Sequence, residues 1–114
     1  MEKDLEARTK RFALSVIRFS SSLPRTREGD VLARQLLRSA TSIGAKYREA
    51  NRGVSRADFA NKIGTVQKKA AETQYWLELL LDSALAGSGN AQELLEESSE
   101  LLGVFASIGK KLKE

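Results

Sequence analysis

The sequence predicts an all-α protein, an antiparallel up-down-up-down four-helix bundle, on three observations. Apolar residues recur at helical spacing in four segments. Short loops join these segments, and the one clear loop signal is the run 86–90, AGSGN. One Pro and 6% aromatic residues accompany an apolar content of 41%. The 114 residues suit one compact domain, residues 1–114. Helices of roughly 20 to 28 residues would be about 30 to 40 Å long.

The first helix is expected to run from Leu5 to Leu23, because Pro24 disfavours the α region at the residue before it. Its core face is predicted to contain Leu5, Thr9, Phe12, Ala13, Val16, Phe19 and Leu23. The second helix is expected over about residues 26–52, with Thr26 as its N-cap and Gly53 as its stop. Its core face is predicted to contain Leu32, Leu36, Ala40, Ile43, Tyr47 and Ala50.

The third helix is expected to begin at Ser55, with Asp58 at the capping-box position, and to end before Ala86. Its predicted core face contains Phe59, Ile63, Val66, Ala70, Thr73, Leu77 and Leu80. The fourth helix is expected to begin at Asn90, with Glu93 at the capping-box position. Its predicted core face contains Leu94, Leu95, Leu101, Leu102, Phe105, Ile108 and Leu112.

The composition argues against several classes of function. The chain has no Cys and no His, so it offers no thiolate nucleophile or thiolate metal site and no imidazole for proton transfer. Glu93, Glu97 and Glu100 share a helix face, but that face lies away from the apolar stripe, unlike the inward carboxylates of diiron bundles. We therefore expect no enzyme activity, cofactor, metal or small-molecule substrate. The polar N-terminus and short apolar runs predict a cytoplasmic protein with no membrane partner.

The net charge of +4 is unevenly distributed along the chain. Residues 25–69 contain eleven basic and four acidic residues, a local charge of +7. Residues 70–100 contain seven acidic and no basic residues, a local charge of −7. Such polarity suits either an anionic partner or a charge-matched protein contact.

Four arginines of the second predicted helix gather within about 80° of each other on a helical projection. They are Arg34, Arg38, Arg48 and Arg52, on the face opposite the core positions. Arginine presents a planar fork to phosphate oxygens, so this stripe is a candidate nucleic-acid-binding face, with Lys46 and Arg56 at its edge. The alternatives are a solvated face and a face that docks an acidic protein. No aromatic residue of the second helix interleaves with the stripe.

A second apolar surface is predicted at Tyr75, Trp76 and Leu79. Tyr75 and Leu79 point away from the core face of the third helix, with Trp76 at its edge. A helix that is apolar nearly all round needs a second partner, which predicts a homo-oligomer. The alternative is that the 86–90 loop or the fourth helix covers these residues within one chain.

Two stretches resemble a known family. They are RQLLRSATSIGAKYREA at 34–50 and DFANKI at 58–63, the latter running on to ETQYWLELL at 72–80. They resemble the four-helix-bundle proteins of the 23S rRNA intervening-sequence family, also called S23-type, over about Phe12 to Ile108. Lys46 and Lys69 stand where that family often has Asn and Glu, which adds positive charge.

The resemblance implies an all-α bundle that assembles into a ring, often a pentamer, with a basic surface. Some members of the family are encoded within insertions in 23S rRNA genes. A related branch accompanies reverse transcriptases of retroelements and binds nucleic acid and the polymerase. No catalytic residues are known in the family. Two functions follow as expectations: RNA binding through the arginine stripe, or a scaffold that docks an acidic protein partner such as a reverse transcriptase.

Overall fold

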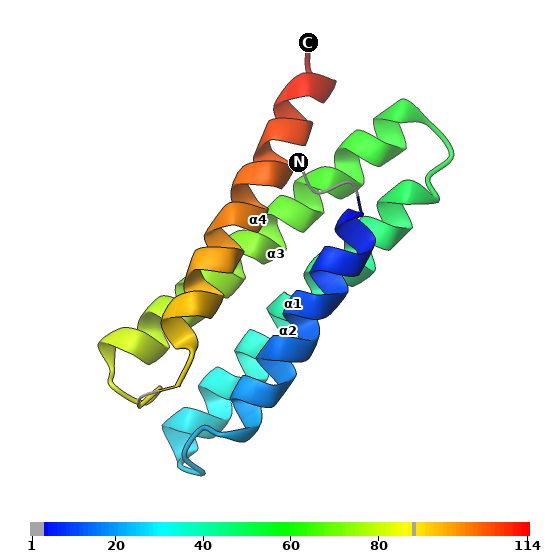
Figure 1. Ribbon diagram of the computed structural model, residues 1–114. Coiled ribbons are helices and arrows are strands. Elements are labelled where there is room, and N and C mark those ends of the chain that lie inside the picture. Colours follow the sequence, from blue (N-terminus) through cyan, green and yellow to red (C-terminus); the bar gives the residue numbers. More distant parts are fainter. Residues whose placement is uncertain (1–3, 88) are drawn as a thin grey trace.

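The computed structural model describes residues 4–87 and 89–114, and it places four helices in the described part of the chain. The helices are α1 (Leu5–Ser21), α2 (Arg27–Asn51), α3 (Arg56–Asp82) and α4 (Ala91–Leu112). They form an elongated body of 44 × 22 × 21 Å, with the start of α1 and the end of α4 toward the same end of the bundle (Figure 1). The all-α four-helix fold is thereby confirmed.

The bundle consists of two helical hairpins. Helix α2 packs along both α1 and α3, and α3 packs along α4. Helix α1 meets α4 over a short stretch only. The two hairpins, α1–α2 and α3–α4, are therefore joined mainly through α2 and α3 (Figure 1).

Side chains cap three of the four helix starts. Thr26 accepts a hydrogen bond from the amide of Gly29 at 3.0 Å, and Ser55 accepts one from the amide of Asp58 at 3.0 Å, as predicted. Asp4 caps α1, which the sequence reading did not assign. The carboxylate of Asp58 accepts from the amide of Val54 at 3.3 Å, one residue earlier than a capping box requires.

The predicted capping box of the fourth helix is wrong. Asn90 does occupy the N-cap position of α4, but its side chain makes no capping hydrogen bond. Its backbone lies at φ −88° and ψ 31°, whereas Thr26 and Ser55 are extended at their N-caps. An extended N-cap turns the side-chain oxygen toward the amides of the first turn, and Asn90 lacks that conformation.

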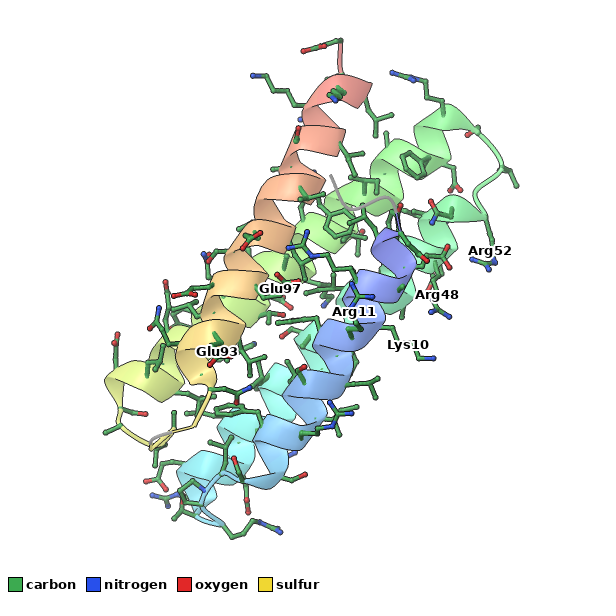
Figure 2. The ribbon with its side chains drawn as sticks, viewed as in Figure 1. Lys10, Arg11, Arg48, Arg52, Glu93 and Glu97 are labelled. Atoms are coloured by element: carbon green, nitrogen blue, oxygen red, sulfur yellow. The ribbon has the colours of Figure 1, made fainter. Side chains whose placement is uncertain are left out.

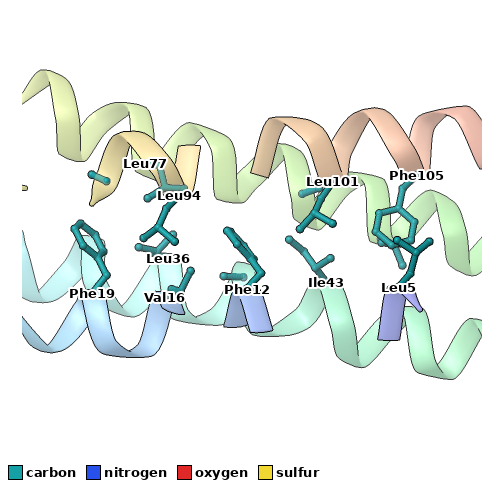
Figure 3. Close-up of a cluster of buried hydrophobic side chains, with 14 of the residues drawn as sticks. Leu5, Phe12, Val16, Phe19, Leu36, Ile43, Leu77, Leu94, Leu101 and Phe105 are labelled. Atoms are coloured by element: carbon teal, nitrogen blue, oxygen red, sulfur yellow. The ribbon is translucent and has the colours of Figure 1, made fainter. Parts of the chain in front are cut away.

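The core is a continuous column of apolar side chains along the bundle axis (Figure 3). Val16, Leu36, Ile43, Leu77 and Phe105 are among its fully buried members. Several predicted core residues are half-buried at its margin instead: Leu32, Tyr47, Phe59, Leu95, Leu102, Ile108 and Leu112. Ala13 is half-buried as well, on the α1–α2 side. The apolar face of each helix is wider than the strip that four helices can enclose.

Helices α1 and α2 approach each other closely at Gly44. A Cβ built on Gly44 would lie 3.0 Å from Oγ1 and 3.2 Å from Cβ of Thr9 on α1. Thr9 is fully buried, and its hydroxyl donates to the carbonyl of Leu5 at 2.7 Å. The missing side chain at Gly44 therefore sets the spacing of the first hairpin.

Candidate nucleic-acid interface

The four arginines of the predicted stripe are all exposed, three of them on α2 and the fourth, Arg52, at its C-cap. A straight α-helix rises about 1.5 Å per residue, so the eighteen steps from Arg34 to Arg52 span about 27 Å. The stripe divides into two parts that differ in their partners. Arg34 and Arg38 lie toward the start of α2, and Arg48 and Arg52 lie at its end.

The pair at the end of α2 shares one carboxylate from α1. Arg48 Nε lies 3.6 Å and Arg52 Nη1 lies 3.7 Å from the carboxylate oxygens of Glu6. Asn51 donates a hydrogen bond to the same carboxylate at 2.8 Å, and Arg52 also donates to the carbonyl of Arg48 at 2.9 Å. One negative charge thus offsets two positive ones, and this end of the stripe keeps a net positive charge. Glu6 could not be found from the charges of α2 alone, because it lies on α1.

Arg34 and Arg38 carry their charge without such a partner. In the described part of the chain, neither guanidinium forms an ion pair or a side-chain hydrogen bond. Arg34 borders a groove on the α1–α2 side, together with Ile17 and Leu37. Arg38 borders a pocket on the α2–α3 side. Toward the start of α2, two guanidinium groups are therefore available to bind an anion.

The two predicted edge residues are both engaged within the chain. Lys46 is half-buried and lies 3.4 Å from the carboxylate of Glu49 on its own helix. Arg56, at the start of α3, donates a hydrogen bond to the carbonyl of Leu112 at 3.3 Å. A cation there also meets the negative end of the α4 dipole. These contacts give both residues a role in the fold.

One basic residue of α1 extends the positive surface beyond α2. Lys10 is exposed and borders, with Glu6 and Arg48, a groove between α1 and α2 (Figure 2). Arg11 is exposed on the α4 side of α1 instead, where it borders a groove with Glu93 and Glu97. The sequence predicted a stripe on α2 alone, since the helical projection of one helix does not show which neighbour lies beside it.

The acidic surface lies on another part of the bundle. Glu93 and Glu97 project from α4, away from Arg48 and Arg52 (Figure 2). Arg8 of α1 pairs with this surface, with 2.7 Å from Nη2 to Glu97 Oε1 and 3.2 Å to Glu100 Oε1. Hydrogen bonding to Glu97 raises the pKa of the Arg8 guanidinium above its usual range. Glu72 of the 70–100 segment borders the same pocket as Arg38 but pairs with Lys69, so no acidic residue of that segment forms an ion pair with the arginine stripe in the described part of the chain.

The second apolar surface predicted at Tyr75, Trp76 and Leu79 is partly exposed. Tyr75 is 53% exposed, while Trp76 and Leu79 are half-buried. The rings of Tyr75 and Trp76 lie with centroids 5.2 Å apart and planes inclined at 58°. Tyr75 is therefore open to a further contact over about half of its surface.

The described residues contain no group of three or more acidic side chains placed to hold a metal ion. None of the helices in that part of the chain is both long and apolar enough to cross a bilayer.

The fold and the charge distribution place this protein in a class of basic four-helix bundles with an exposed row of arginines. The model of the 23S rRNA-intervening sequence protein family matches residues 3–107, and the chain belongs to that family. It is similar to a crystal structure of a protein of unknown function from the S23 ribosomal protein family of Bacteroides thetaiotaomicron VPI-5482. The two share 36% sequence identity and a TM-score of 0.84, over 92% of this chain and 97% of that one. No curated protein matches the chain.

Proposed function

We propose that the protein is a non-enzymatic, oligomeric RNA-binding protein that contacts the phosphate backbone through the arginine stripe of α2. The observation that carries this proposal is the state of Arg34 and Arg38. Both guanidiniums are exposed, and neither has an acidic partner in the described chain. An exposed, unpaired guanidinium can form a bidentate, charge-assisted contact with a phosphate without first breaking an intramolecular ion pair.

Backbone contacts of this kind are weakly sequence-specific and strongly salt-dependent. With four phosphate contacts, we expect affinity for a structured rRNA fragment to fall about a hundredfold between about 50 and 200 mM salt. The variant R34Q/R38Q/R48Q/R52Q should bind weakly and lose most of this salt dependence. Fluorescence anisotropy of labelled RNA measures both quantities.

The matched control removes four positive charges elsewhere. The variant K68Q/K110Q/K111Q/K113Q changes the net charge equally, but its residues lie on α3 and at the end of α4. It should keep most of the affinity and the salt slope. An unchanged affinity in the stripe variant, or an equal loss in both variants, would refute the proposal.

The oligomer is proposed to form through Tyr75 and Leu79, with Trp76 at the margin of the contact. An aromatic side chain exposed to 53% beside further apolar surface is typical of a contact surface. The resemblance to S23-type proteins implies a ring, often of five copies. Light scattering at tens of micromolar tests this, and a monomeric mass would contradict it. Tyr75→Glu should lower the mass, whereas Val54→Glu, at a residue 94% exposed, should not.

The second candidate is a scaffold that docks an acidic protein, such as a reverse transcriptase. The observation in its favour is that the stripe lacks a matching acidic surface within its own chain while residues 70–100 carry seven acidic residues. Untagged protein that purifies with another protein and with a 280/260 nm absorbance ratio free of nucleic acid would favour it over RNA binding.

A further inference from the structure

A small pocket lies between α2 and α3, where the arginine stripe meets the flank of α3. Its volume is about 200 Å³. Pockets that enclose drug-sized ligands measure about 300–1,000 Å³, so this one suits a single small planar group. The side chains at its rim are Gln35, Arg38, Ser42, Lys69, Glu72 and Trp76.

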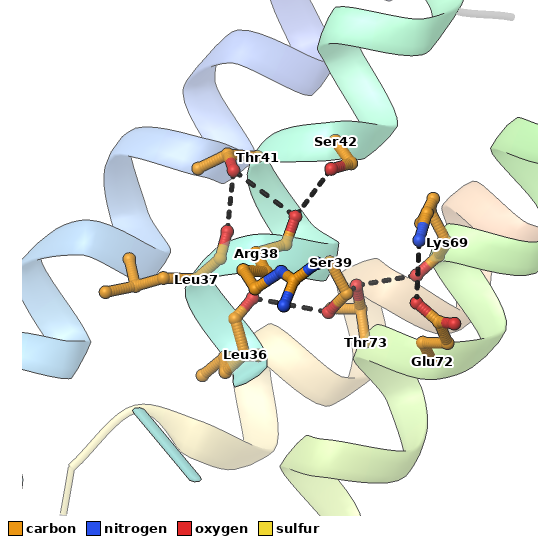
Figure 4. A network of polar contacts seen from close by, with 9 residues as sticks. All are labelled: Leu36, Leu37, Arg38, Ser39, Thr41, Ser42, Lys69, Glu72 and Thr73. Carbon is orange, nitrogen blue, oxygen red and sulfur yellow. Dashed lines mark hydrogen bonds and ion pairs between the residues drawn. The ribbon is translucent and has the colours of Figure 1, made fainter. Parts of the chain in front are cut away.

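The base of the pocket is fixed by two buried hydroxyls (Figure 4). Thr73 Oγ1 lies 2.9 Å from Ser39 Oγ and 2.8 Å from the carbonyl of Lys69. Ser39 is 2% exposed and Thr73 is fully buried. Because this contact joins α2 to α3 directly beneath the pocket, the pocket is held in shape without a ligand.

Some polar groups at the rim of the pocket form hydrogen bonds or ion pairs within the chain, and others do not. Lys69 lies 3.3 Å from the carboxylate of Glu72, and the hydroxyl of Ser42 donates to the carbonyl of Arg38 at 2.6 Å (Figure 4). By contrast, the Gln35 amide, the Arg38 guanidinium and the Trp76 indole N–H have no partner in the described chain. Since Lys69 offsets Glu72, Arg38 supplies the net positive charge of the pocket.

An aromatic surface, a cationic fork and a free amide therefore converge on one site. Proteins recognise unpaired nucleotides with this combination: the base lies against an aromatic ring, its edge meets an amide, and an arginine holds the phosphate. On the sequence alone, no aromatic residue accompanies the stripe. The structure supplies one from α3, because Trp76 faces the same pocket as Arg38.

We propose that this pocket holds one unpaired nucleotide of an RNA strand, with the base against Trp76, the base edge at Gln35 and the phosphate on Arg38. This inference rests on the proposed RNA-binding function. Trp76 lies about 100° from Tyr75 and about 60° from Leu79 around α3, toward α2. An oligomer contact centred on Tyr75 and Leu79 therefore adjoins the pocket.

Trp76 reports on the pocket directly, because it is the only tryptophan in the chain. The test titrates the full-length oligomeric protein with two labelled RNAs of equal length, a single strand and a fully paired duplex. Anisotropy measures binding, and Trp76 fluorescence measures contact with a base. We expect both RNAs to bind and only the single strand to quench the fluorescence.

Arg34 offers a matched control for Arg38, since it belongs to the same stripe but lies outside the pocket. Arg34→Gln should weaken strand and duplex equally. Arg38→Gln should weaken the strand further and reduce the quenching. Trp76→Leu should weaken strand binding about tenfold and leave duplex binding unchanged, while Trp76→Phe should retain the strand affinity. Thermal unfolding followed by circular dichroism confirms that each variant is folded.

Binding of both RNAs without quenching would overturn the proposed nucleotide site, and so would equal effects of Arg34→Gln and Arg38→Gln. Either result would be consistent with the proposed contact between the arginine stripe and the RNA backbone. If neither the strand nor the duplex binds, both proposals are overturned. A free nucleoside monophosphate that quenches at the same concentration as the strand would assign the pocket to mononucleotides and overturn the assignment to a strand.

Discussion

The guanidinium of Arg8 on α1 donates two hydrogen bonds, each 2.7 Å long, to the carboxylate of Glu97 on α4. The two side chains are 16% and 30% exposed, so solvent screens this pair less than a pair on the open surface. The contact bridges the edge of the bundle where α1 and α4 otherwise meet only briefly. A bidentate ion pair is therefore the main polar connection between the two hairpins at this edge.

Glu97→Gln should lower the free energy of unfolding by about 1–2 kcal/mol, because it weakens a charge-assisted pair and leaves a half-buried guanidinium with only the exposed Glu100 as its counterion. Urea denaturation measures the change. Glu100 is the matched control: it lies 3.2 Å from Arg8 but is 70% exposed, so Glu100→Gln should cost less than about 0.5 kcal/mol. Equal losses in the two variants would show that the geometry of the Glu97 pair adds nothing.

Two glycines within helices should respond to alanine in opposite directions. A Cβ at Gly103 meets nothing within 4 Å, so Gly103→Ala should stabilise the protein by about 0.5–1 kcal/mol through helix propensity. Gly44→Ala gains the same propensity but places a methyl group against Thr9, so α1 has to move. We expect Gly44→Ala to be less stable than the wild type by about 1 kcal/mol. Thermal and urea unfolding compare them, and stabilisation by Gly44→Ala would show that α1 adjusts freely.

The loop after α3 contains a strained alanine. Ala84 has φ of 62°, in the left-handed region that glycine adopts without cost. Ala84→Gly should therefore stabilise the protein by about 0.5–1 kcal/mol, measured by urea denaturation. Gly87, with φ of 61°, provides the reverse control, and Gly87→Ala should destabilise it. A loss of stability in Ala84→Gly would mean that the entropy of the unfolded chain outweighs the strain.

The start of α3 should contribute to acid sensitivity. The pKa of Asp58 is lowered, chiefly because Lys62 donates hydrogen bonds to its carboxylate at 2.9 and 3.0 Å. A carboxyl whose pKa is lowered by folding stabilises the protein above its unfolded pKa, and that stabilisation disappears as the pH falls through the folded value. Asp58→Asn should therefore lose less stability than the wild type between pH 7 and pH 3. Lys62→Met should show the same reduced dependence, and an unchanged profile in both would contradict this account.

The fold could be predicted from the sequence because the spacing of apolar residues along each helix shows which face of that helix is buried. The 3.6-residue periodicity placed Val16, Ile43, Leu77 and Leu101 at positions that the structure fully buries. Local chemistry also placed the capping side chains of Thr26 and Ser55. It failed at Asn90, where the residue type is right but the backbone is not extended.

The candidate site could be predicted from the sequence only in part, for a physical reason. Periodicity showed that the arginines of α2 lie outside the core, which the structure confirms by their exposure. It could not show which residues of other helices stand beside them, because that depends on how the helices rotate and align. The ion pair of Glu6 with Arg48, and the position of Trp76 at the same pocket as Arg38, both depend on that alignment.

The brief meeting of α1 with α4 has a consequence for how the chain opens. Loss of α1 would leave the long α2–α3 and α3–α4 interfaces intact, whereas loss of any other helix would break at least one of them. We therefore expect the amides of α1 to exchange with solvent before those of α3, because α1 has a long interface with α2 only.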